Sequence, residues 1–156
     1  MKGISLIEVA IGTAIISSIL LALGSVAQYS LHLSKNSTLR LQAVFLASEG
    51  VEAVKTLRDS GWSANIAPLN AGTDYYVVFE TDHYVTTTSP PALIDGLFQQ
   101  KIVFENTNRD ANDDIVESGG VADPNTKKVS VTVSWNYRNV AREETIRTYV
   151  ANMFND

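Results

Sequence analysis

The chain has 156 residues with 12 Lys and Arg, 17 Asp and Glu, and a net charge of -5, and it contains no Cys. This length favours one domain with an appendage. The missing cysteines exclude a disulfide framework and thiol chemistry, and an acidic chain without a run of Lys or Arg is not expected to bind nucleic acid specifically.

The first thirty residues are almost wholly apolar, and the run from Val9 to Val26 carries no charge. An apolar stretch of about 18 residues or more predicts a membrane-spanning helix. Glu8 stands at the head of this run, where an unpaired charge costs about 2.5–3.5 kcal/mol at the centre of a membrane helix. Glu8 must therefore lie at the membrane surface or have a partner. After Glu8 the first Lys or Arg is Lys35, so the nearby sequence supplies no cation except Lys2.

Two ordinary interpretations of this segment stay open. A secretory signal needs a basic start, an apolar region of 7–15 residues and a small-x-small cleavage site. The basic start here is only Met1-Lys2, and the apolar run is longer than that range. A cleavage site could be imitated by residues 22–27. A plain membrane anchor would need no cleavage at all.

The segment Gly3-Ile4-Ser5-Leu6-Ile7-Glu8-Val9 resembles the class III signal of type IV pilins and pseudopilins. The resemblance implies that residues 1–3 form a leader, which prepilin peptidase cuts after Gly3 on the cytoplasmic side. The same enzyme would then N-methylate Ile4, where this family usually has Phe or Met. Glu8 is the fifth residue after that cut, as the family pattern requires.

Cleavage before Ile4 would create an α-amino cation at the head of an apolar helix. In a bundle of such helices the Glu8 carboxylate of one copy can pair with the Ile4 amine of a neighbour. Each charge then has a partner in a place of low dielectric, where neither is stable alone. We therefore expect Ile4 and Glu8 to be assembly residues; the alternative is that Glu8 only reaches to the membrane surface.

Helical spacing continues beyond the apolar run, and the first proline is Pro68. We expect a helix from about residue 5 to 59, with 4–33 as the membrane or filament-core half and 34–61 as an amphipathic half. Gly61 suits a left-handed cap. Two apolar stripes are candidates for the buried face: they comprise Leu41, Val44, Ser48 and Val51, and Leu46, Gly50, Ala53 and Leu57.

Residues 62–156 predict a globular domain with an antiparallel sheet. The clearest strand is 127–137, where Val129, Val131, Val133 and Trp135 alternate with polar residues. A turn is expected over Arg138–Ala141, and Trp62 and Trp135 are expected to be buried. The other predicted strands are 75–81, 83–88, 97–106, 115–116 and 144–151. The fold class is therefore α+β: a long N-terminal helix packed on a C-terminal antiparallel sheet, which is the type IV pilin-like arrangement.

The stretches 46–53, 57–62 and 123–129 also resemble minor pilins and pseudopilins. The resemblance implies a structural subunit, a minor pilin or pseudopilin, of a type IV pilus or pilus-like filament serving adhesion, secretion or DNA uptake. Its partners would be other pilin subunits, prepilin peptidase and an inner-membrane assembly platform. It would cross the cytoplasmic membrane once with its sheet domain outside, and then enter an extracellular or periplasmic filament. A major pilin and a permanently anchored extracytoplasmic binding module are the alternatives.

One loop offers oxygen ligands at alternate positions, which suits Ca²⁺. The candidate ligands are Asp110, Asn112, Asp113 and Asp114. Some pseudopilins bind calcium in C-terminal loops, but we favour a solvated turn, because the loop lacks the Gly and the distant bidentate Glu of a twelve-residue calcium loop. The sequence has no recognisable nucleophile elbow and no phosphate-binding glycine loop, so we expect neither catalytic residues nor a resident cofactor.

Overall fold

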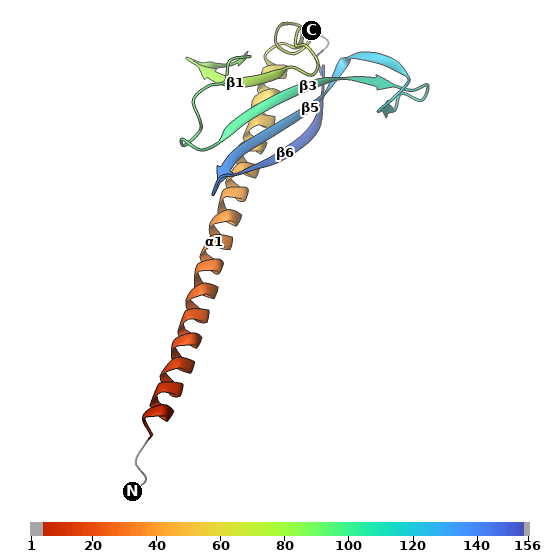
Figure 1. Ribbon diagram of the computed structural model, residues 1–156. Helices are drawn as coiled ribbons and strands as arrows, with labels where there is room; N and C mark the ends of the chain where they lie inside the picture. The colour runs from red at the N-terminus through yellow and green to blue at the C-terminus, as the bar shows by residue number, and fades with distance from the viewer. Residues whose placement is uncertain (1–4, 155–156) are drawn as a thin grey trace. The chain divides into compact units, whose positions relative to one another are not determined.

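The protein has an α+β fold, in which one long N-terminal helix packs through its last part on an antiparallel sheet (Figure 1). The computed structural model describes residues 5–154. The chain forms two compact units, one up to Leu39 and one from Arg40 onward. The elements are α1 (Leu6–Asp59), α2 (Trp62–Asn65), β1 (Asp74–Glu80), β2 (His83–Thr87), β3 (Gln99–Arg109), β4 (Ile115–Val116), β5 (Val121–Tyr137) and β6 (Val140–Ala151).

The predicted long helix is confirmed as the single element α1. Its first turn is closed at Ser5, whose carbonyl accepts the backbone N–H groups of Glu8 and Val9 at 2.9 and 3.2 Å. Its end follows from Gly61, which adopts a φ of 136° that residues with a side chain rarely adopt. The helix therefore begins and ends within a residue of the predicted bounds because the sequence has no proline before the glycine that stops it.

The sheet has the strand order β2-β1-β3-β5-β6, with β4 paired to β3, and every pairing is antiparallel. The strand predicted at 127–137 is confirmed but begins earlier, at Val121, and its partner β3 runs on to Arg109. The register shifts where Asn106 pairs with Lys127 but Thr107 pairs with Asp123. Pro124 lies in this irregularity, which is where a proline without an N–H is tolerated in a strand.

The turn between β5 and β6 is shorter than predicted. Tyr137 pairs with Val140, so only Arg138 and Asn139 form the turn, with φ values of 54° and 61°. Two residues with positive φ match the right-handed twist of a hairpin. The last strand consequently begins at Val140 rather than near Glu144.

The buried face of α1 consists mainly of small residues and differs in part from the two predicted stripes. Leu41 is 55% exposed, whereas Ala43 and Ala47 are fully buried. Gly50 explains the difference, because a Cβ at this position would lie 2.8 Å from Cγ1 of Val131 in β5. Helix and sheet approach so closely here that only small side chains fit between them. The buried helix residues from Arg40 onward include Ala43, Ala47, Gly50, Val51, Ala53, Val54 and Leu57.

Candidate functional site

The apolar segment of α1 is the first candidate site. From Leu6 to Leu33 its large apolar side chains are exposed, each by at least half, and none is buried within the chain. Full burial of such a side chain is worth roughly 1.5–3 kcal/mol. A helix so long and apolar could cross a membrane. Soluble proteins rarely expose a continuous apolar surface of this size, so the segment is a candidate for contact with lipid or with other chains.

Glu8 lies in the first turn of α1, where a carboxylate also interacts favourably with the helix dipole. Glu8 is exposed, and its carboxylate forms no ion pair with any of the residues 5–154. The predicted processing residues Gly3 and Ile4 lie outside the described residues. The predicted contact between Glu8 and an Ile4 amine therefore stays a prediction.

The predicted calcium loop forms a tight turn held by its own side chains. The carboxylate of Asp110 accepts the backbone N–H groups of Asn112 and Asp114 at 2.8 and 3.0 Å. Asp113 takes a φ of 68° within this turn. Among residues 5–154 no three His, Cys, Asp or Glu side chains are grouped to hold a metal ion. These contacts leave calcium binding by this loop untested.

The guanidinium of Arg109 contacts both sides of this loop. It donates to the carboxylate of Asp123 at 2.7 Å and to the carbonyl of Asp113 at 2.7 Å. The hydrogen bond to Asp123 raises the pKa of Arg109. Burial by itself would raise the pKa of Asp123, but hydrogen bonds from Thr126, Arg109 and the N–H of Asn125 together lower it. This arrangement ties the end of β3 to the beginning of β5.

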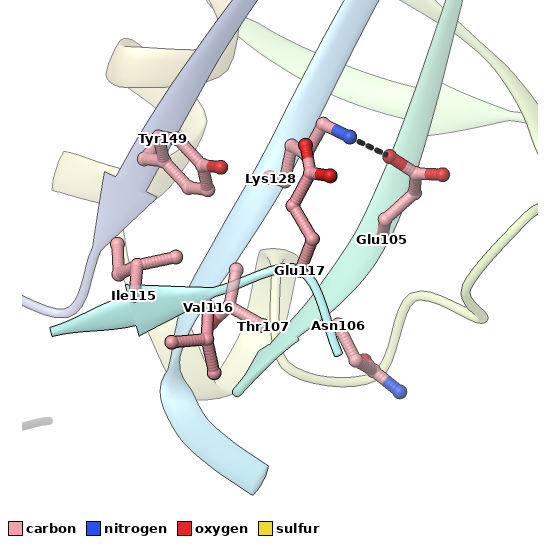
Figure 2. A pocket seen from close by; sticks show the side chains of 8 residues that line it. All are labelled: Glu105, Asn106, Thr107, Ile115, Val116, Glu117, Lys128 and Tyr149. Carbon is pink, nitrogen blue, oxygen red and sulfur yellow. Dashed lines mark ion pairs between the residues drawn. The ribbon is translucent and has the colours of Figure 1, made fainter. Parts of the chain in front are cut away.

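A pocket of about 320 Å³, which sequence reasoning missed, opens where β3, β5 and β6 pass beneath β4. Figure 2 shows Glu105, Lys128 and Tyr149 on three neighbouring strands, with Glu117 reaching over them from the end of β4. The pairing register aligns Glu105 with Lys128 and Lys128 with Tyr149. The alternation along 127–137 predicts which residues share the sheet face that carries Lys128. It does not predict the pocket, because the register between distant strands is not visible in the sequence. The pocket is also lined by Asn106, Thr107, Ile115 and Val116.

The charges in this pocket do not cancel. Lys128 forms an ion pair with Glu105 at 3.0 Å, and this hydrogen bond raises the pKa of Lys128. The negative charge of Glu117 acts in the same direction from a longer distance. Two carboxylates and one ammonium leave the pocket with one negative charge at neutral pH. Chemically, the pocket suits a cationic group that can also lie against the half-exposed ring of Tyr149.

Four aromatic side chains belong to the core and offer no exposed surface to a ligand. Trp62 and Trp135 are 2% and 5% exposed, as the packing interpretation predicted. Tyr75 and Tyr76 are also buried, and Tyr75 packs edge-on against Phe104.

Comparison of this chain with protein-family models, with curated proteins and with solved structures finds no match.

Proposed function

We propose that this chain is a structural subunit of a type IV pilus or pilus-like filament, a minor pilin or pseudopilin. In this proposal prepilin peptidase cuts between Gly3 and Ile4, and the subunit waits in the cytoplasmic membrane with its sheet domain outside. An assembly platform then moves it into the filament. The helix is buried among the helices of neighbouring subunits, and Glu8 pairs with the Ile4 amine of one of them.

The observation that carries the proposal is one carboxylate at the head of an otherwise uncharged and uncovered helix. The apolar surface from Leu6 to Leu33 needs a cover, which a membrane and a helix bundle can each supply. A single acid in that cover needs a cation. Among residues 5–154 Glu8 has no ion-pair partner, and the amine released at Ile4 by cleavage is the charge that fits.

Mass spectrometry of the mature N-terminus tests the processing step. The proposal expects a chain that begins at Ile4, with or without a methyl group. An intact Met1 would instead favour the permanently anchored module, and a cut near Ala27 would favour an ordinary secretory signal. Either of these two results overturns the proposal.

Replacing Glu8 tests the assembly step. Glu8→Ala should leave membrane insertion and cleavage intact but remove the chain from sheared filaments. Breaking a buried pair leaves its partner uncompensated and costs roughly 3–5 kcal/mol, which corresponds to more than a hundredfold loss of incorporation. Ser18→Ala is a matched control on the same helix, since the Ser18 hydroxyl bonds only the Ile15 carbonyl one turn back. Equal incorporation of the Glu8 variant and the control would contradict a pairing role.

A further inference from the structure

The two ends of β5 carry opposite charge. The segment from Glu105 to Lys128, which contains the loop and the pocket, has six acids and three bases, a net charge of -3. The opposite end, from Asn136 to Arg142, has two arginines and no acid. Figure 1 shows these two regions at opposite ends of the long strands β5 and β6. Lys128 and Arg138 are ten positions apart along β5 and the turn that follows it, a distance of roughly 34 Å at most.

The bases at the acidic end are already engaged within the chain. Arg109 is bonded to Asp123, Lys127 donates to the side chain of Asn106, and Lys128 pairs with Glu105. Glu117 forms no ion pair with any of the residues 5–154 and faces the pocket (Figure 2). The pocket therefore has one carboxylate without a matching cation.

Arg138 is the complementary group at the other end. It occupies the tip of the β5–β6 hairpin, is exposed, and has no hydrogen-bond or ion-pair partner within the described range 5–154. A guanidinium is flat, so it can donate two parallel hydrogen bonds to one carboxylate while it stacks on an aromatic ring. Glu117 and Tyr149 offer these two surfaces in the same pocket.

We propose that two copies of this chain contact each other head to tail, with Arg138 of one copy bound in the pocket formed by Glu117 and Tyr149 of the next. Because the two contacting surfaces are different, the contact can repeat in one direction without closing, which produces an open filament rather than a dimer. Lys128 keeps its own partner Glu105 and is not displaced. Arg147, two residues from Tyr149, does not line the pocket.

This contact rests on the proposed function in the form in which the chain is the repeating pseudopilin of its filament, because copies of the chain must lie next to one another. It adds a polar contact between sheet domains to the apolar contact between helices. It also specifies which neighbour is accepted, since a subunit without an arginine at the hairpin tip would not match the pocket.

Disulfide trapping tests the contact in full-length chains assembled in cells. The chain has no Cys, so two introduced thiols are the only ones present. The double variant Arg138→Cys with Glu117→Cys should give a ladder of covalent multimers under mild oxidation. A mixture of the two single variants should stop at dimers. Asp82→Cys with Glu117→Cys is the matched control, because Asp82 also stands in an exposed hairpin turn, and it should give no ladder.

The outcomes separate this proposal from the filament function. Filaments that form normally but give no ladder overturn the contact and leave the filament function intact. An uncut N-terminus overturns the function whatever the ladder shows. If the double cysteine variant does not accumulate, a charge exchange serves as the test instead. Arg138→Glu and Glu117→Arg should each reduce the yield of filaments at least tenfold, and the two substitutions together should restore it. An exchange variant that stays as poor as the single variants also overturns the contact.

Discussion

Gly50 gives the sharpest test of how helix and sheet pack. A Cβ added there would lie 2.8 Å from Cγ1 of Val131 and 2.7 Å from Nε2 of Gln100. Both distances are shorter than real Cβ contacts allow, so neighbouring atoms must move. Val131 is fully buried in β5, so its side chain cannot turn out into solvent. We therefore expect Gly50→Ala to destabilise the protein, although alanine is the better helix former.

The size of the effect follows from three contributions. Alanine in place of glycine favours a helix by roughly 0.8–1 kcal/mol. Forcing a methyl group into a packed core costs about 1–3 kcal/mol. The Gln100 side chain must also give up its hydrogen bond to the carbonyl of Leu46, which contributes about 1 kcal/mol. The net loss in free energy of unfolding is about 1–3 kcal/mol.

Equilibrium urea unfolding of the full chain in detergent, followed by tryptophan fluorescence, measures this loss. Trp62 and Trp135 are both buried and report on the packed domain. With a slope of about 1–3 kcal/mol per molar urea, the midpoint should fall by roughly 1 M. Ser48→Ala is the matched control, because Ser48 is exposed on the same helix and bonds only the carbonyl of Val44. A Gly50→Ala midpoint equal to or above that of the control would refute the close approach.

Two further predictions concern the loop between β3 and β5. The lowered pKa of Asp123 contributes stability that is present above its unfolded value of about 3.9 and is lost as the pH falls through the folded value. Asp123→Asn should therefore lower stability at neutral pH and flatten its decline in acid; an unchanged acid decline would show that the pair with Arg109 does not form. Millimolar Ca²⁺ should not raise the melting temperature, because the carboxylate of Asp110 already accepts backbone N–H groups and Arg109 already supplies a cation to the loop. A higher melting temperature together with a heat of binding in calorimetry would contradict this and show that the loop binds calcium.

The features that the sequence predicted well are those set by neighbouring residues. The bounds of α1 depend on an unbroken run of helix formers and on Gly61, and both are local. The alternation in β5 places Val129, Val131 and Val133 on one face, and all three are fully buried. Periodicity is sufficient wherever one face of an element meets a single core.

The extension of β5 to Val121 was beyond such reasoning. The added residues are polar, and Pro124 normally argues against a strand. Their stability depends on contacts between distant segments: the hydroxyl of Thr107 donates to the carbonyl of Thr126, and Arg109 bonds Asp123. Buried and part-buried polar pairs of this kind leave no apolar pattern in either segment. The pocket beside Tyr149 was missed for the same reason, because it depends on the register of three strands.

The two candidate sites differ in what each part of the chain must supply. At the N-terminus all the required features lie within one run of residues: a uniform apolar surface, one acid and a predicted cleavage that releases one cation. Such a surface gives cohesion but little selectivity, because apolar contacts are not directional. In the sheet domain the opposite holds, since Glu117 and Arg138 are single charges that only a correctly placed partner satisfies. If both contacts form, the helix supplies most of the binding free energy and the sheet domain determines which subunit is bound next. Glu8→Ala should then reduce incorporation of the variant chain whichever subunit lies next to it. Arg138→Glu should reduce it only where the neighbouring subunit still carries Glu117.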